Sequence, residues 1–276
     1  MNIDDALARA RAALERSEAL VVAAGAGMGV DSGLPDFRGD QGFWRAYPPL
    51  GRLGLRFAEM ANPRWFRVDP TLAWGFYGHR LDLYRATPPH RGFLHLHASA
   101  THMPGGIFAF TSNVDGHFQA AGFDPDRVCE AHGSIRHLQC LDPACDAGIW
   151  PAPAAAIAVD SETMRATGDL PTCPRCGELA RPNILMFGDG AWLEARTAAQ
   201  TRRLQSWLAA QSGRRLTVVE IGAGLAVPTV RRFSEQLAAA RPGAVLVRIN
   251  PRDPGGPAGT ISLPRGALEA LDALGL

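Results

Sequence analysis

Four uninterrupted apolar runs, each long enough for one strand, constrain the fold of this chain more than any other feature. Every run ends at glycine or at small polar residues. The runs are residues 19–24, 106–110, 216–221 and 244–249. Strands that are apolar on both faces occur in parallel sheets covered by helices on each side. We therefore expect an α/β fold, with any ligand bound at the carboxyl ends of these strands.

Helical spacing of apolar residues occurs near both ends of the chain. Leu7, Ala10 and Leu14 recur at intervals of three and four residues. Asp4 stands before them and is the expected N-cap. Further helices are expected at about 228–240 and 268–276.

Two stretches interrupt the α/β pattern. Residues 41–90 are rich in aromatic residues, proline and arginine, which indicates a helical insertion. Residues 134–180 hold four of the five cysteines, several prolines and an alanine run, which indicates a small module held together by a metal ion. The segments 1–40, 91–133 and 181–276 would then form the main sheet domain.

The clustered cysteines form two short hooks. Cys140 and Cys145 are separated by four residues, Cys173 and Cys176 by two, and 27 residues lie between the hooks. Four thiolates can complete a tetrahedral Zn²⁺ site with Zn–S distances of about 2.3 Å and no open position, which is typical of a structural zinc. Two local disulfides or unrelated buried thiols are the alternative, and a reducing compartment disfavours disulfides. Cys129 lies in an apolar run and is expected to be a buried core residue.

Composition excludes several classes of protein. The chain has 28 arginines and no lysine, so it cannot use a lysine Schiff base or a phosphate-binding lysine. Its formal net charge of +1 gives no basic field, so no nucleic acid partner is expected. No apolar run approaches the roughly 20 residues that span a bilayer, and the N-terminus lacks a secretory pattern. We therefore expect a cytoplasmic protein with no membrane partner.

Two glycine turns are candidates for a nucleotide site. They are Gly25-Ala26-Gly27 and Gly222-Ala223-Gly224, each directly after an apolar run. Glycine lets backbone N–H groups approach a phosphate at the start of a helix. One such turn is weak evidence, because glycine also serves merely to turn the chain, and no third glycine follows at the Rossmann spacing. Two turns in one sheet favour a dinucleotide ligand.

The order of the motifs is the most specific signal. In chain order they are Gly25-Ala-Gly27, Ser32-Gly-Leu-Pro-Asp-Phe-Arg-Gly39, Thr111-Ser-Asn-Val-Asp115, Ala131-His-Gly133, the cysteine hooks, Arg181-Pro-Asn-Ile-Leu-Met-Phe-Gly-Asp189, Gly222-Ala-Gly224 and Ile249-Asn-Pro251. From about residue 20 to residue 251 the chain resembles the sirtuin (Sir2) family of NAD-dependent protein deacylases. The resemblance implies a Rossmann-like parallel sheet with helices on both faces. It also implies a small domain made of a helical insertion and a zinc-binding insertion, with NAD between the two domains.

The resemblance also implies roles for individual residues. His132 would be the general base, and Asn113 and Asp115 would hold the ribose and the nicotinamide carboxamide. The residues implied to bind NAD are Gly25, Ala26, Gly27, Asp36, Phe37, Arg38, Ser112, Gly222, Gly224 and Asn250. An imidazole has an unperturbed pKa near 6.5, which suits proton removal from a ribose hydroxyl. A hydrogen-bonded core histidine is the alternative interpretation of His132.

A further implied group would bind the acyl chain. Tyr77 and Arg80 share one face of a predicted helix. Their spacing resembles the pair with which succinyl- and malonyl-removing sirtuins grip an acidic acyl group, as a phenol and a guanidinium can. Phe187 would line the same site. The alternative for the pair is an amphipathic helix with an aromatic core face and a solvated arginine.

Four positions depart from the family pattern. The family usually has glutamine at the position of Ser112 and commonly serine at those of Gly29 and Gly224. Glu220 puts a carboxylate in a normally apolar strand, where we expect it to lie close to the cofactor. Residues 219–224 and 113–123 look more like a macrodomain-associated branch that resembles ADP-ribosyltransferases. That branch typically lacks the family histidine, whereas this chain keeps His132.

The expected function is therefore an NAD-dependent protein-lysine deacylase with a structural zinc. It would act on an acylated-lysine protein or peptide, as a deacetylase or as a desuccinylase and demalonylase, and would release nicotinamide and O-acyl-ADP-ribose. NAD-dependent ADP-ribosyl transfer or NAD hydrolysis is the second expectation. A catalytically lapsed, zinc-stabilised NAD-binding interaction protein is the third.

Overall fold

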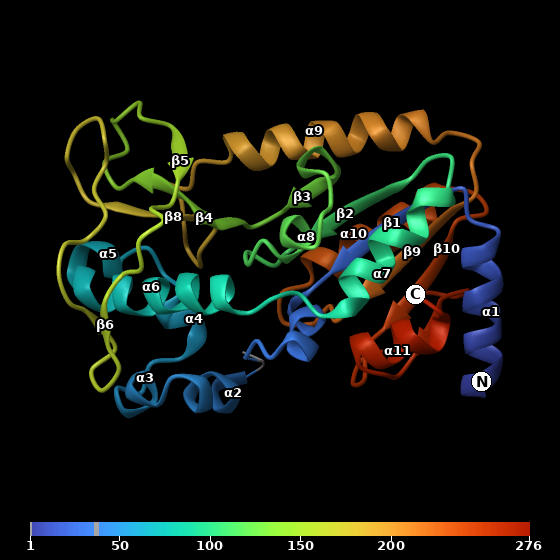
Figure 1. Cartoon of the computed structure of the whole chain (residues 1–276), viewed down its shortest axis with the longest axis horizontal. Helices are drawn as coiled ribbons and strands as arrows, with labels where there is room; N and C mark the ends of the chain where they lie inside the picture. The colour runs from blue at the N-terminus through green and yellow to red at the C-terminus, as the bar shows by residue number, and fades with distance from the viewer. Residues whose placement is uncertain (1, 36–38) are drawn as a thin grey trace.

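The four apolar runs form neighbouring strands in the computed structural model of the chain, which describes residues 2–35 and 39–276 (Figure 1). They are β1 (Ala19–Ala24), β2 (Ile107–Thr111), β9 (Leu216–Ile221) and β10 (Val245–Ile249), all paired in parallel. Two short strands, β3 (Val128–Glu130) and β11 (Ile261–Leu263), complete a six-stranded sheet in the order β11-β10-β9-β1-β2-β3. The predicted α/β fold with a parallel sheet is confirmed.

Helices cover both faces of this sheet. One face packs against α1 (Ile3–Glu15), α7 (Arg91–Ser99), α8 (His117–Ala120) and α11 (Ala267–Leu274). The other packs against α9 (Ala195–Ala210) and α10 (Thr229–Ala240). Alternate residues of a strand point to opposite faces, so Leu20 belongs to the first apolar cluster and Val21 to the second. Within the described residues, none of the helices combines the length and the hydropathy that crossing a membrane requires.

The cap of the first helix differs from the prediction. The helix begins at Ile3, and the side chain of Asn2 accepts a hydrogen bond from the N–H of Asp4 at 3.2 Å. Asn2 is therefore the N-cap, and the assignment of Asp4 to that position is wrong. Asp4 instead lies in the first turn, where a carboxylate interacts favourably with the positive end of the helix dipole.

The aromatic segment and the cysteine segment fold against each other at one end of the sheet (Figure 1). The aromatic segment forms α2 (Gly39–Ala46), α3 (Pro48–Arg52), α4 (Phe57–Met60), α5 (Trp65–Val68) and α6 (Pro70–Ala86). The cysteine segment forms the antiparallel sheet β5 (Ile149–Pro151), β4 (Gly133–Cys140), β8 (Ala180–Ile184) and the hairpin β6 (Val159–Asp160), β7 (Arg165–Ala166).

One hydrophobic core joins these two segments. Gly75 of α6 makes the approach possible, because a Cβ at this position would lie 2.1 Å from the carbonyl oxygen of Met164. The indole N–H of the neighbouring Trp74 donates to the carbonyl oxygen of Ala180 at 2.9 Å. The short 3-10 helices η1 (Ala26–Ser32), η2 (Ala100–His102) and η3 (Pro125–Arg127) complete the described elements.

Candidate functional site

The two glycine turns meet at the carboxyl edge of the sheet. The N–H of Gly25 donates to the carbonyl oxygen of Ile221 at 2.9 Å, and the N–H of Gly27 donates to that of Gly222 at 3.0 Å. Gly222 has φ of +64°, and a Cβ there would lie 2.5 Å from the Cα of Gly27. Both the backbone conformation and the contact between the turns therefore require glycine at position 222.

Backbone donors remain available beside these turns. Within the described ranges, the N–H groups of Ala26 and Gly224 donate to no acceptor. Ala26 is exposed at the start of η1, and open space lies where a Cβ of Gly224 would stand. Unpaired N–H groups of this kind suit a phosphate. The predicted contacts of Asp36, Phe37 and Arg38 with NAD fall outside the described residues.

The turn after β2 brings further predicted residues to the same edge. Nδ2 of Asn113 donates to the carbonyl oxygen of Gly25 at 3.0 Å and so ties this turn to the first glycine turn. Asp115 is buried, and its Oδ1 accepts a hydrogen bond from the N–H of His117 at 2.9 Å. Ser112 lies half-buried before Asn113. The predicted ribose and nicotinamide contacts are thus next to the predicted phosphate turn.

His132 lies after β3, beside the residues that follow β2. The preceding residue, Ala131, donates its N–H to the carbonyl oxygen of Thr111 at 2.7 Å. Nε2 of His132 lies 3.0 Å from Oγ1 of Thr229, the first residue of α10. Burial lowers the pKa of His132 below its usual value, so the ring is neutral at neutral pH and keeps a lone pair that can accept a proton. No pattern in the sequence indicates the contact with Thr229, because 97 residues separate the two.

Asn250 is fully buried at the end of β10. Its Nδ2 donates to the carbonyl oxygen of Ala223 at 2.8 Å, and its Oδ1 accepts from the N–H groups of Arg252 and Asp253, each at 3.0 Å. The carboxamide thereby holds the second glycine turn against the loop that follows β10. For the predicted contact with the adenosine ribose, the same carboxamide would have to bind the ribose in addition to these three backbone groups.

Glu220 forms a buried ion pair with the neighbouring strand and contacts α10. Its buried carboxylate accepts hydrogen bonds from Nε and Nη2 of Arg248 at 2.6 and 2.8 Å, and from the hydroxyl of Ser234 on α10. Arg248 is the residue opposite Glu220 on the neighbouring strand β10. The role of Glu220 in the described structure is a buried ion pair between strands, and its expected position beside the cofactor stays a prediction.

The predicted acyl-binding residues lie in two different settings. Tyr77 and Arg80 are both buried on α6, so the alternative of a solvated arginine is wrong. Nε and Nη2 of Arg80 donate to the hydroxyl of Tyr84 at 3.1 and 2.6 Å. Burial strongly raises the pKa of Tyr77, and its hydroxyl has no hydrogen-bond partner among the described residues. Phe187 is 41% exposed, and its N–H donates to the carbonyl oxygen of Ala61 at 2.9 Å.

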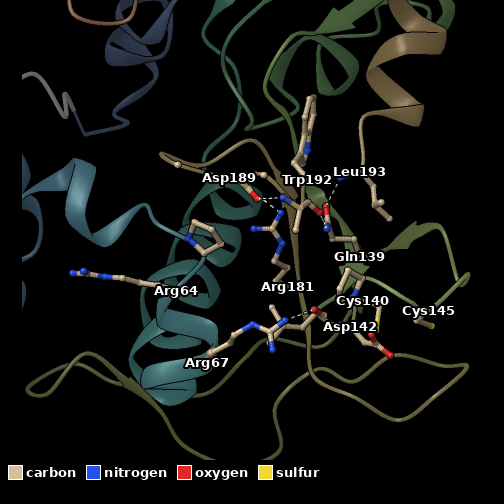
Figure 2. Close-up of a pocket in the computed structure, with 16 residues that line it drawn as sticks. Arg64, Arg67, Gln139, Cys140, Asp142, Cys145, Arg181, Asp189, Trp192 and Leu193 are labelled. Carbon is tan, nitrogen blue, oxygen red and sulfur yellow. Dashed lines mark hydrogen bonds and ion pairs between the residues drawn. The ribbon is translucent and has the colours of Figure 1, made fainter.

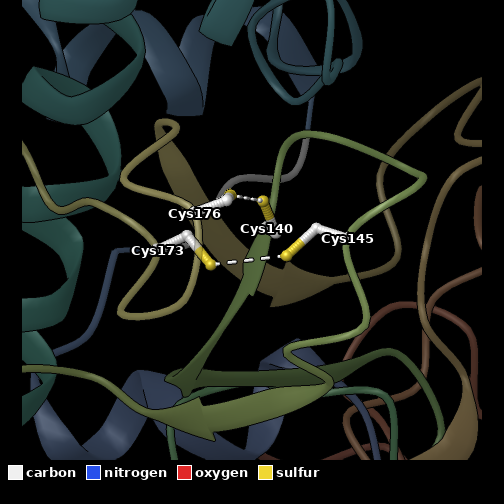
Figure 3. Close-up of side chains that lie close together, drawn as sticks. All are labelled: Cys140, Cys145, Cys173 and Cys176. Atoms are coloured by element: carbon white, nitrogen blue, oxygen red, sulfur yellow. Dashed lines mark hydrogen bonds between the residues drawn. The ribbon is translucent and has the colours of Figure 1, made fainter.

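The four predicted metal ligands come together at one point (Figure 3). Sγ of Cys140 lies 3.6 Å from that of Cys176, and Sγ of Cys145 lies 3.7 Å from that of Cys173. A tetrahedral zinc with bonds of about 2.3 Å requires sulfur–sulfur distances of about 3.8 Å, whereas a disulfide requires about 2.05 Å. The cluster fits Zn²⁺, and none of the four thiols is in a disulfide.

A cavity of about 500 Å³ lies between the first cysteine hook and the loop after β8 (Figure 2). The buried ion pair between Arg181 and Asp189, with an N–O distance of 2.7 Å, forms part of its wall. Arg67 also lines the cavity and donates to the carbonyl oxygen of Leu141 at 2.9 Å. None of the NAD-binding residues predicted within the described ranges lines this cavity. It is therefore separate from the glycine turns.

Comparisons with known proteins agree on one family. The model of the Sir2 family matches residues 25–209. The chain is 32% identical over 177 residues to NAD-dependent protein deacylase 1 of Caldanaerobacter subterraneus subsp. tengcongensis, an alignment that covers 64% of this chain and 63% of that protein. It is 31% identical over 199 residues to an NAD-dependent protein deacylase of Thermus thermophilus, which covers 70% and 69%.

Solved structures give the same result over more of the chain. A Sir2 homologue in complex with NAD superposes with a TM-score of 0.68 at 26% identity, covering 97% of this chain and 91% of that one. A mutant Sir2 homologue in complex with ADP-ribose gives a TM-score of 0.70 at 26% identity, covering 96% and 94%.

Proposed function

Because this chain belongs to the Sir2 family, we propose that it is an NAD-dependent protein-lysine deacylase that releases nicotinamide and O-acyl-ADP-ribose. Similar proteins named as NAD-dependent protein deacylases support this activity. The observation that most supports this activity is the position of His132, a half-buried, neutral imidazole near the turn that holds Asn113 and Asp115. A general base next to a nucleotide-binding edge is what the reaction requires.

The chain offers groups that would hold both NAD and zinc. The N–H groups of Ala26 and Gly224 would bind the pyrophosphate, and Asn113 with Asp115 would orient the nicotinamide end. When bound, NAD supplies an ADP-ribosyl group that can be transferred with loss of nicotinamide. The four cysteines would hold a structural Zn²⁺, which takes no part in the chemistry because its coordination is closed.

The residues at the sheet edge would share the catalytic work. His132 would accept the proton of a ribose hydroxyl, because burial keeps its imidazole neutral at neutral pH. Asp115 is held by the N–H of His117, so its carboxylate has a fixed position for the nicotinamide end. A positioned charge in a site closed to water stabilises developing charge more strongly than it would in bulk water.

The surroundings of α6 support an acidic acyl group as one substrate. Arg80 lies over the aromatic rings of Phe76 and Tyr84 at 5.2 and 5.3 Å, and the unpartnered hydroxyl of Tyr77 is on the same helix. A guanidinium and a phenol together can bind a carboxylate. We therefore include removal of succinyl or malonyl groups, beside acetyl groups, in the proposed function.

The substrate would be a peptide segment that carries the acylated lysine. Phe187, Leu225 and Val227 are apolar side chains exposed on the loops after β8 and β9. We expect the peptide to add as a strand between residues 188–189 and 225–226, with these side chains around the lysine.

Mass spectrometry of acetylated and succinylated peptides incubated with NAD and the protein tests the proposal. Loss of the acyl group with formation of O-acyl-ADP-ribose is expected. His132→Ala should lower this rate by at least about 100-fold. A peptide that keeps its acyl group and gains one ADP-ribose would instead indicate ADP-ribosyl transfer. Binding of NAD without any release of nicotinamide would indicate a lapsed enzyme.

A further inference from the structure

Within the described residues, the imidazole of His132 has one hydrogen-bond partner, the hydroxyl of Thr229. The Nε2–Oγ1 distance is 3.0 Å. Thr229 is the first residue of α10. It and the second glycine turn both lie in the segment that follows β9. Nδ1 of His132 makes no hydrogen bond in this part of the chain and is not among its fully buried, unpartnered atoms, so it is accessible.

We propose that Thr229 is a positioning residue for the general base: its Oγ1 accepts the Nε2–H of His132 and leaves the lone pair on the accessible Nδ1. The proposal rests on the deacylase function proposed above. In a neutral imidazole, the hydrogen bond at one nitrogen decides which nitrogen carries the proton. If Thr229 donated to Nε2 instead, the accessible Nδ1 would carry the proton and could not act as a base.

The proton transfer that we propose involves the ribose hydroxyl, Nδ1 of His132 and the hydrogen bond to Thr229. A ribose hydroxyl gives its proton to Nδ1, so that one O–H bond breaks and one N–H bond forms. The resulting imidazolium carries a proton on each nitrogen, and its Nε2–H stays donated to Oγ1 of Thr229. A hydrogen bond from a charged donor is roughly twice as strong as one from a neutral donor, so Thr229 stabilises the protonated ring.

Charged groups on the elements around His132 are committed to other partners. Glu130 of β3 pairs with Arg196 of α9, Asp189 after β8 pairs with Arg181, and Glu220 of β9 pairs with Arg248. Arg136 of β4 donates to the carbonyl oxygen of Asp115, and Arg231 of α10 donates to that of Ala223. Burial is the cause of the lowered pKa of His132, and no described charged residue contributes. A change at Thr229 can therefore be detected in the titration of His132.

Steady-state kinetics of Thr229→Val test the proposal, since valine removes the hydroxyl and keeps the branched shape. We expect kcat to fall at least about tenfold, which corresponds to the lower end of the range for one hydrogen bond to a charged group. KM for NAD and peptide should change less than about twofold. The acidic limb of kcat/KM should move to lower pH, because the imidazolium loses a stabilising acceptor. Thr229→Ser should restore both values. Thr201→Val is the matched control, because it removes a threonine hydroxyl on α9 that contacts the thiol of Cys129 on β3. This variant should behave like the wild type.

Nitrogen-15 NMR of the protein without substrates shows which tautomer the His132 imidazole adopts, and it does not require an active enzyme. The signals of His132 are assigned as those that are present in the wild type and absent from the spectrum of His132→Gln. We expect the Nε2–H tautomer in the wild type and a mixture of tautomers in Thr229→Val. An Nδ1–H tautomer in an active wild type, or an unchanged pH profile in Thr229→Val, would overturn the role of Thr229 alone. A wild type that removes no acyl group would overturn the proposed function, and this role with it.

Discussion

Replacing Glu220 by glutamine is expected to destabilise the fold by about 3 kcal/mol. The carboxylate is fully buried and accepts two hydrogen bonds from Arg248, whose side chain is fully buried as well. Glutamine removes the charge and leaves Arg248 with Glu235, at 2.7 Å, as its carboxylate partner. Breaking a buried pair costs about 3–5 kcal/mol, and the retained Glu235 places the expected cost at the lower end of this range.

Thermal unfolding followed by circular dichroism measures this effect. In a chain of this size, about 3 kcal/mol corresponds to a decrease of roughly 6–12 °C in Tm. Glu269→Gln is the matched control, because Glu269 is 62% exposed and forms a surface pair with Arg265 at 3.0 Å. Its loss should change Tm by less than about 2 °C, as surface pairs are worth little.

A double variant separates the loss of a pair from the loss of packing. Glu220→Leu combined with Arg248→Met removes both charges, so most of the lost stability should return. If Glu220→Gln unfolds at the same temperature as Glu269→Gln, the buried pair is not important for stability and the reasoning is refuted.

Three further predictions concern the base, the metal and the acyl group. Because burial lowers the pKa of His132, the acidic limb of kcat/KM should lie below pH 6.5, the ordinary histidine value, and a limb at or above it would contradict the assignment. Metal analysis of protein purified without chelators should find about one zinc per chain, and Cys173→Ser should lower both the zinc content and Tm; a variant that keeps both would disprove the four-thiolate site. Tyr77→Phe should slow desuccinylation about tenfold relative to deacetylation, because it removes one donor to the acyl carboxylate; equal effects on both peptides would dismiss the clamp.

The central strands could be predicted from the sequence because each one is a continuous apolar run. Residues 216–221 form β9 without any shift, and 244–249 differ from β10 by one residue. The edge strand β11 has only three residues and follows a loop rich in proline and glycine, so it has no run of its own. The helix α9 mixes small apolar and polar residues and buries only a narrow stripe that includes Leu204 and Trp207. Its sequence therefore shows no clear helical periodicity.

Parts of the candidate site that consist of one short sequence motif could be predicted from the sequence. The glycine turns and the cysteine hooks each consist of residues that are close in the sequence, so their spacing indicates their local geometry. The contact of Thr229 with His132 joins residues far apart in the chain. The pair of Glu220 with Arg248 depends on the register of two strands. Neither contact follows from local sequence, because both are set by which strands are neighbours.

A crystal structure of the protein with NAD tests the central claim most directly. The account predicts the pyrophosphate on the turns at Gly25 and Gly222, and a hydroxyl of the nicotinamide ribose within hydrogen-bonding distance of His132. NAD bound elsewhere, or with that ribose out of reach of the His132 imidazole, would contradict it.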